Sequence, residues 1–136
     1  MVELHHINIS THNVPGLDRF YRTALGLRRL PGHLDQARIL DQTSAPATFL
    51  SAGHDIQLHL ATVEMDVPFG TGQFVNPVAR GHIAFRTDDM DEVKDRLTRA
   101  NVNFSDYGEW AMKGWHQLFF QDPIGTVIEV HQLVRG

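Results

Sequence analysis

Nine of the 136 side chains in this sequence are histidines, and several of them stand in short segments where polar and apolar residues alternate. Four of these alternating positions are His6, His59, His82 and His131. Glu129 stands two residues before the last of them, and Gln57 two residues before the second. Imidazole, amide and carboxylate groups are the side chains that bind a borderline or hard divalent ion. The sequence has no cysteine, so neither a thiolate site nor a cysteine nucleophile is available.

The segments that carry these groups read as strands, because successive side chains of a strand point to opposite faces. The four segments are 3–10, 55–61, 81–87 and 126–132. One face of each is apolar, and the other faces together collect His6, Gln57, His59, His82, Glu129 and His131. A face that meets water usually carries lysine, and these segments contain none. We therefore interpret the polar face as the lining of a metal site, with a merely solvated sheet face as the alternative.

The remaining histidines are expected to play structural or solvent-exposed roles. His5 should point away from His6, because neighbouring residues of a strand face opposite sides. His116 is expected to be a packed or capped histidine rather than a ligand. His12, His33 and His54 fall in predicted loops.

Two helices and two further strands complete the predicted elements, and they repeat in order. Segments 13–26 and 88–101 have apolar residues at helical spacing, and segments 47–52 and 115–121 read as strands. His6-Ile7 matches His82-Ile83 at an offset of 76, and "IQLH" from residue 56 matches "IEVH" from residue 128 at an offset of 72. This predicts one α+β domain of two paired βαβββ modules, with the helices packed on the apolar face of the sheet. Module one spans 1–61, a linker 62–80 and module two 81–136.

Composition narrows the class of function. The formal net charge is −4, and no basic cluster is interleaved with aromatic residues, so nucleic acid is not an expected partner. No segment has the roughly 20 apolar residues that a membrane span needs. The first ten residues lack the pattern of a signal peptide, so we expect a cytoplasmic protein.

The chain resembles the vicinal oxygen chelate superfamily, which includes glyoxalase I, fosfomycin-resistance enzymes and extradiol dioxygenases. The resemblance rests on "LHHINIS", "DRFYRTALGL", "GHIAF" and "DPIGTVIEV", in this order along the chain. It implies an open cup-shaped sheet with the helices on its outer face, and one divalent ion per site, either Zn, Ni, Mn or Fe(II). The implied ligands are His6, Gln57, His82 and Glu129. Gln57 takes a place that is often glutamate, and His59 is the alternative for that position.

The resemblance further implies a small-molecule substrate that chelates the ion through neighbouring oxygens. His59, Gln117, Phe119 and His131 would face the substrate, and Glu129 would also move the proton in a glyoxalase-I-like lyase or isomerase. The alternatives are an extradiol-type dioxygenase, a thiol transferase and a metal-free, bleomycin-resistance-like binding protein. Short members suggest a homodimer in which His6 and Gln57 of one chain meet His82 and Glu129 of the other.

Overall fold

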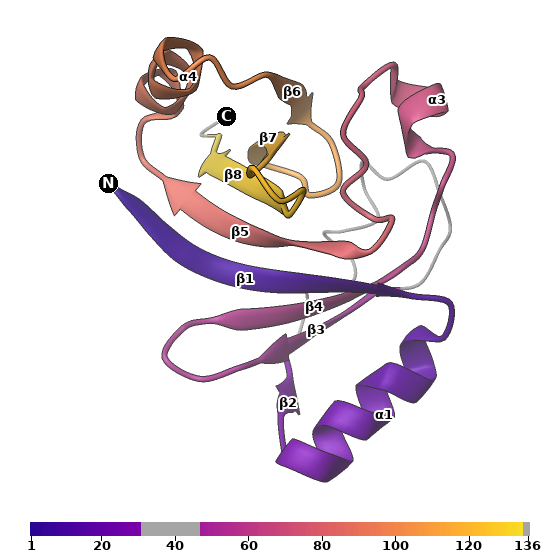
Figure 1. Cartoon of the computed structure of the whole chain (residues 1–136). Helices are drawn as coiled ribbons and strands as arrows, with labels where there is room; N and C mark the ends of the chain where they lie inside the picture. Colours follow the sequence, from indigo (N-terminus) through magenta and orange to yellow (C-terminus); the bar gives the residue numbers. More distant parts are fainter. Residues whose placement is uncertain (31–46, 135–136) are drawn as a thin grey trace.

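The computed structural model describes residues 1–30 and 47–134, which form one curved, eight-stranded mixed sheet with helices outside it (Figure 1). The strand order is β2-β3-β4-β1-β5-β8-β7-β6. The first half of the chain contains β1 (Val2–Thr11), α1 (Val14–Leu25), β2 (Arg28–Arg29), β3 (Ala47–Ser51) and β4 (Gln57–Thr62). A short helix, α3 (Val67–Thr71), follows. The second half contains β5 (Gly81–Thr87), α4 (Met90–Arg99), β6 (Phe104–Glu109), β7 (Trp115–Gln121) and β8 (Val127–Leu133).

The two halves join along β1 and β5, which pair antiparallel at the centre of the sheet. Ile7 of β1 lies opposite Ile83 of β5, so equivalent positions in these two inner strands differ by 83 − 7 = 76 residues. Within each half the inner strand pairs in parallel with the last strand, β1 with β4 and β5 with β8. The predicted α+β class and the paired βαβββ modules are therefore confirmed.

The offset between β4 and β8 differs from the predicted one. Asn8 of β1 lies opposite His59, and its counterpart Ala84 of β5 lies opposite Glu129. The structural offset is therefore 129 − 59 = 70, and His59 rather than Gln57 is the counterpart of Glu129. A slip of two residues keeps every side chain on its own face, so alternation along a strand cannot detect it. The matching letters of "IQLH" and "IEVH" favoured the wrong alignment.

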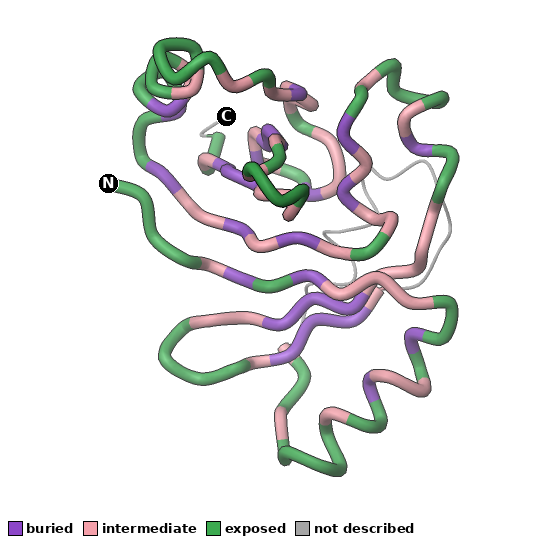
Figure 2. Tube along the Cα trace, viewed as in Figure 1, coloured by how far each residue is buried: buried purple, intermediate pink, exposed green. Residues whose placement is uncertain are grey.

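The helices cover the outer, apolar face of the sheet, α1 over β3 and β4, and α4 over the second half (Figures 1 and 2). Each begins at a side chain that accepts from the first turn, Asn13 from Gly16 N at 2.9 Å and Asp89 from Glu92 N at 3.1 Å. The buried residues of the first core are Val14, Leu50, Leu58 and Leu60, and those of the second are Met90, Val93, Leu118 and Val130. These cores leave the inner face of the sheet for polar groups.

The predicted linker, 62–80, has structure of its own and packs against the second half of the chain. It contains α3, and its residue Val75 is buried against β6, where Tyr107 Oη donates to the Val75 carbonyl. Gln73 Nε2 donates to the Asp106 carbonyl at 2.9 Å. The segment thereby closes one side of the cup.

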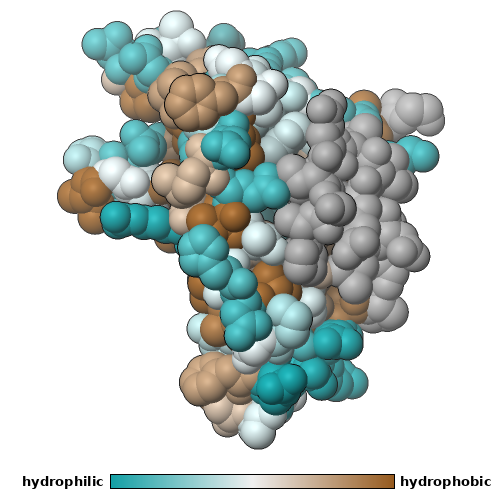
Figure 3. All heavy atoms as spheres, turned by 90° about the vertical axis from the view of Figure 1, so that its right-hand side faces the viewer, coloured by the Kyte–Doolittle hydropathy of each residue, from teal (hydrophilic) through white to brown (hydrophobic). Residues whose placement is uncertain are grey.

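The surface seen from the right of Figure 1 mixes hydrophobic and hydrophilic side chains (Figure 3). Among residues 1–30 and 47–134, no helix has the length and apolar character needed to cross a membrane.

Candidate metal centre

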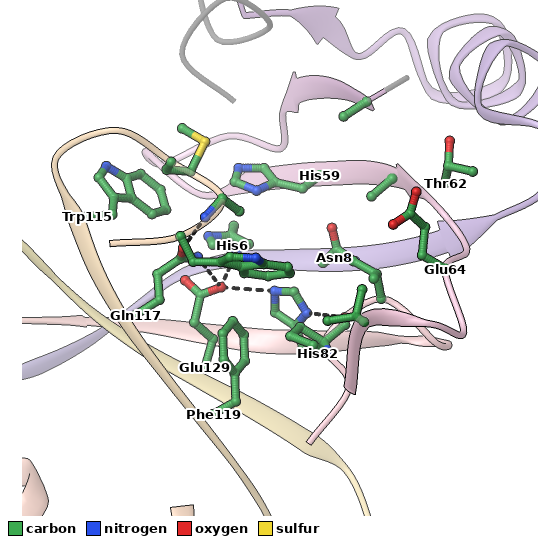
Figure 4. A pocket seen from close by; sticks show the side chains of 18 of the residues that line it. His6, Asn8, His59, Thr62, Glu64, His82, Trp115, Gln117, Phe119 and Glu129 are labelled. Atoms are coloured by element: carbon green, nitrogen blue, oxygen red, sulfur yellow. Dashed lines mark hydrogen bonds and ion pairs between the residues drawn. The ribbon is translucent and has the colours of Figure 1, made fainter. Parts of the chain in front are cut away.

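Three buried side chains from three neighbouring strands meet on the inner face of the sheet: His6 of β1, His82 of β5 and Glu129 of β8 (Figure 4). His82 Nε2 lies 3.1 Å from Glu129 Oε1, and His6 Nε2 lies 3.7 Å from the same oxygen. All three belong to one chain, so this cluster forms without a second subunit. It contains three of the four ligands implied by the family resemblance, His6, His82 and Glu129.

The hydrogen bond at His82 Nδ1 shows which of the two ring nitrogens carries the proton. His82 Nδ1 lies 2.8 Å from the Pro77 carbonyl, which can only accept, so Nδ1 carries the proton. In the neutral ring, Nε2 then directs a lone pair at the Glu129 carboxylate. Two acceptors 3.1 Å apart repel each other unless a cation or a proton lies between them. The arrangement matches a metal-binding histidine, whose second nitrogen typically donates to a carbonyl or carboxylate.

The protonation states of the cluster suit a cation. Burial by itself raises the pKa of the Glu129 carboxyl, but His6, His131 and His82 more than offset this and hold that pKa well below its usual range. Burial lowers the pKa of the His6 imidazole, against the opposing effect of Glu129. We therefore describe Glu129 as an ionised carboxylate beside a neutral His6 imidazole, and these are the states that bind a metal.

Two groups outside the cluster fix the carboxylate. Gln117 Nε2 donates to Glu129 Oε1 at 3.3 Å, and Gln117 Oε1 in turn accepts from Ala111 N at 3.0 Å. His131 Nδ1 lies 2.6 Å from the other oxygen, Glu129 Oε2. Because both oxygens have partners, the carboxylate is held in one orientation.

His59 and Gln57 lie at different depths. His59 lines the cavity and stacks on the His6 ring with 3.7 Å between centroids and 16° between planes. Gln57 lies behind it, outside the cavity lining, with Oε1 2.7 Å from His59 Nε2. Burial lowers the pKa of His59 well below its usual value, so this imidazole is neutral. Position and register both favour His59 over Gln57 as the fourth group of the site.

His5 lies on the same side as His6, which contradicts the expectation from alternation. The β1–β5 register shifts between Leu4 and His6, the mark of a bulge, and a bulge lets successive residues share a side. The two Nδ1 atoms are 2.9 Å apart. His116, by contrast, is the packed residue that was expected, with Nε2 2.7 Å from Asp106 Oδ1.

The cavity above the cluster has a volume of about 100 Å³ and largely apolar walls. Its polar floor contains His6, Asn8, His59, His82, Gln117 and Glu129, and its walls include Phe49, Val67, Val78, Trp110, Met112, Trp115 and Phe119. Among the described residues that line it, none is lysine or arginine. Three of the four predicted substrate-facing residues, His59, Gln117 and Phe119, line the cavity, whereas His131 lies beneath Glu129 and outside the lining.

Sequence reasoning missed Glu64, a second carboxylate of the cavity lining. It belongs to the segment 62–80, which was interpreted as a linker because of its glycine, proline and asparagine content. No periodic pattern marks such a residue, since it reaches the cavity only through the path of a loop.

The donor set fits a divalent ion. Two ligands bound about 2.0–2.1 Å from one tetrahedral ion lie about 3.3 Å apart, close to the 3.1 Å and 3.7 Å between the imidazole nitrogens and the carboxylate oxygen. Imidazole and carboxylate suit Zn, Ni, Mn and Fe(II) alike, so the donors do not select one metal.

Solved structures share this fold at low sequence identity. A hypothetical protein from Bacillus halodurans has a TM-score of 0.67 and 19% identity, over 99% of this chain and 96% of the other. Methylmalonyl-CoA epimerase from Mycobacterium tuberculosis has a TM-score of 0.66 and 17% identity, over 98% of this chain and 89% of that one. The Streptomyces coelicolor methylmalonyl-CoA epimerase, in complex with 2-nitronate-propionyl-CoA, has a TM-score of 0.62 and 19% identity, over 98% of both chains.

Sequence comparison gives the family directly. No curated protein matches the chain significantly. Residues 3–130, nearly the whole sequence, match the family described as the Glyoxalase/Bleomycin resistance protein/Dioxygenase superfamily. This family and the vicinal oxygen chelate resemblance agree, and the fold and paired modules are those of its members. The chain therefore belongs to the Glyoxalase/Bleomycin resistance protein/Dioxygenase superfamily.

Proposed function

We propose that this chain is a metal-dependent lyase or isomerase of the glyoxalase I type, acting on a small substrate with two neighbouring oxygens. One observation carries the proposal: His6 Nε2, His82 Nε2 and Glu129 Oε1 converge, buried, at the floor of a cavity. A solvated sheet face would not bury two imidazoles against an ionised carboxylate, because the burial of unpaired polar groups is costly.

The residues that would hold the ion are His6, His82 and Glu129, with His59 as the fourth group. When bound, a divalent ion would polarise the substrate oxygens and stabilise negative charge that develops on them. A single carboxylate among these groups leaves a site with a net positive charge, which suits an anionic, enediolate-like state of the substrate.

The cavity walls indicate what else the substrate carries. They are apolar and aromatic, and no described lining residue is a lysine or arginine that would bind a phosphonate. We therefore rank a thiol transferase of the fosfomycin-resistance type below both the lyase or isomerase and the extradiol-type dioxygenase. A small, mainly apolar substrate fits the lining best.

Proton transfer at carbon needs a base, and two carboxylates line the cavity. Glu129 was the candidate from sequence, but in this proposal its Oε1 binds the ion, and its Oε2 accepts from His131. We assign Glu129 to the ion and Glu64 to the proton. Methylmalonyl-CoA epimerase, whose fold this chain shares, is named for a reaction at one carbon centre, which is consistent with this class of chemistry.

The test has a metal arm and a reaction arm. Protein purified without a metal-affinity tag should contain about one divalent ion per chain by elemental analysis. In D₂O it should incorporate deuterium next to the carbonyl of small 2-hydroxyketones, 2-oxo acids or their thiol adducts, as followed by NMR. A chelator should abolish the exchange, and added metal should restore it.

Substitutions distinguish the proposed roles of Glu64 and Glu129. Glu64→Gln should retain the ion and lose the exchange, whereas Glu129→Gln should lose the ion. His116→Phe removes an imidazole that pairs with a carboxylate outside the cavity and should change neither. Protein that carries no ion, or that carries one but gives no chelator-sensitive exchange with any compound, would contradict the proposed activity.

An extradiol-type dioxygenase is the second candidate, and one observation favours it. Two histidines and one carboxylate are the ligand set of many non-haem Fe(II) oxygenases. Fe(II)-loaded protein would then consume oxygen and cleave a catechol ring in an absorbance assay. Oxygen uptake without deuterium exchange would move this candidate to first place.

The shared-site homodimer remains a prediction. His6, His82 and Glu129 lie together in a single chain, so a dimer is not needed to complete this cluster. Sedimentation at low protein concentration with parallel metal analysis would test it.

A further inference from the structure

His131 is the most completely buried histidine of the described chain, and it lies beneath the proposed site rather than in it. Its ring connects two charged groups. Arg86 Nε lies 3.0 Å from His131 Nε2, and His131 Nδ1 lies 2.6 Å from Glu129 Oε2. Arg86 is half-buried near the end of β5 and lines two surface depressions that share no lining residue with the cavity. The three residues form a chain of hydrogen bonds that ends at the proposed ligand.

The direction of each hydrogen bond follows from the chemistry of the groups. A guanidinium N–H only donates, so His131 Nε2 must accept from Arg86. An imidazole that accepts at Nε2 carries its proton on Nδ1. That proton is then donated to Glu129 Oε2, over the short distance typical of a carboxylate partner. Arg86 thereby sets the tautomer of His131. Its hydrogen bond is to the imidazole and not to the Glu129 carboxylate.

Packing fixes the ring in this orientation. Trp115 stacks on His131 with 4.0 Å between centroids and 13° between planes. The Arg86 guanidinium lies 5.2 Å over the same indole ring, and His5 meets His131 edge-on at 4.9 Å. The imidazole therefore has little freedom to turn, and its Nδ1–H stays aimed at Glu129.

We propose that Arg86 and His131 are positioning residues that hold Glu129 as a ligand through one oxygen. Oε2 is committed to His131, and Oε1, which also accepts from Gln117, faces His6 and His82. Binding of an ion by both carboxylate oxygens would cost the bond from His131. The inference rests on the proposed metal-dependent function and adds to it two residues outside the lining of the cavity.

The test measures the ion directly, so no substrate is needed. Co²⁺ is loaded into the wild type, His131→Phe, His131→Asn and the control His116→Phe, and its affinity is measured by competition with a chelating dye. The visible spectrum of bound Co²⁺ reports the arrangement of its ligands. Circular dichroism and melting curves identify any variant that does not fold.

Phenylalanine keeps the stacking on Trp115 but removes the donor, so His131→Phe should weaken Co²⁺ binding about 10- to 100-fold and change the spectrum. The amide nitrogen of asparagine can take the place of Nδ1, so His131→Asn should recover most of the affinity and the wild-type spectrum. His116→Phe should match the wild type. Arg86→Met provides a second route if His131→Phe does not fold, with about fivefold weaker binding expected as the tautomer is released.

The outcomes separate the two levels of inference. A wild type that binds no divalent ion overturns the proposed function, and the positioning role with it. A wild type that binds Co²⁺, together with folded His131→Phe or Arg86→Met of unchanged affinity and spectrum, overturns the positioning role alone. Equal losses in His131→Phe and His131→Asn would also overturn it, since they would trace the effect to packing rather than to the donor.

Discussion

The two halves of the chain place different groups at one structural position. His59 of β4 and Glu129 of β8 are register counterparts, and both face the same cavity. His59 lies between aromatic rings, 3.7 Å from the His6 centroid and 4.0 Å from that of Phe49. Glu129 is surrounded by hydrogen-bond partners instead.

Each environment stabilises one charge state. Burial among rings lowers the pKa of His59 and keeps the imidazole neutral, whereas the partners of Glu129 keep its carboxylate ionised. Each group also has a partner two residues away on its own strand, Gln57 behind His59 and His131 behind Glu129. A repeated scaffold thus provides equivalent positions, and the side chains around each position decide what it can bind.

The largest effect is expected at the charged member of the pair. Glu129→Gln keeps the shape of the side chain and removes the negative charge. Loss of a residue that only hydrogen-bonds to a ligand weakens metal binding by up to roughly 100-fold. Loss of the charged ligand itself should weaken it by more. Dye competition with Zn²⁺ and Co²⁺ gives the number. Affinity within tenfold of the wild type would show that the carboxylate is not a ligand.

The residues that precede the two cluster histidines provide a second contrast, His5 in β1 and Gly81 in β5. Gly81 has φ +139°, and a Cβ there would lie 2.1 Å from the Asn8 carbonyl oxygen on the neighbouring strand. Gly81→Ala should therefore lower the free energy of unfolding by about 2–4 kcal/mol, because backbone must move at the seam between the halves. His5→Ala should cost less than about 1 kcal/mol. Urea denaturation of both variants measures the difference, and equal losses would contradict it.

The third contrast tests the corrected register. His59→Ala should weaken metal binding by about tenfold or more, and Gln57→Ala by less, because Gln57 reaches the cavity only through its bond to His59. The sequence-based alignment makes the opposite prediction. If Gln57→Ala is the more damaging variant in dye competition, the alignment of Gln57 with Glu129 is restored.

Much of this site was accessible from sequence, because alternation places side chains on faces and residue type indicates chemistry. That reasoning found His6, His59, His82 and Glu129, and the family resemblance added Gln117 and Phe119; all six line the cavity. It failed where a neighbouring strand decides the outcome. The slip between Gln57 and His59 preserves the face of each residue, and the bulge that turns His5 inward exists only in the pairing of β1 with β5.

Other parts of the structure had no periodic signal. Strand β6, "FSDYGE", is too polar to be recognised as a strand, and it exists because β7 provides its hydrogen-bond partners. Arg86 shares a strand with His82 but reaches His131 only because β5 pairs in parallel with β8. Residues 31–46, which include the predicted loop position of His33, lie outside the described residues.

The last contrast concerns the ion pairs that connect each helix to an outer strand. In the first half Asp18 of α1 is only 1% exposed and lies 2.5 Å from Arg29 Nη2 and 3.0 Å from Arg22 Nη2. In the second half Lys94 of α4 lies 2.6 Å from Asp106 of β6, whose side chain is 35% exposed. Asp18→Asn should lower the free energy of unfolding by about 1–3 kcal/mol, and Asp106→Asn by less than about 1 kcal/mol.

The difference between these variants should also depend on pH, in a direction that the pKa of Asp18 fixes. Burial raises that pKa, but the hydrogen bonds from Arg29 and Arg22 outweigh burial and hold it below the usual value for a carboxyl, about 3.9. Because the folded chain then binds the proton less readily than the unfolded chain, the stabilisation is complete above about pH 4 and is lost as pH falls further. Urea titrations of the wild type and Asp18→Asn should therefore differ at pH 7 and converge toward pH 3. A constant difference across this range would show that packing, and not the charge of Asp18, connects α1 to β2.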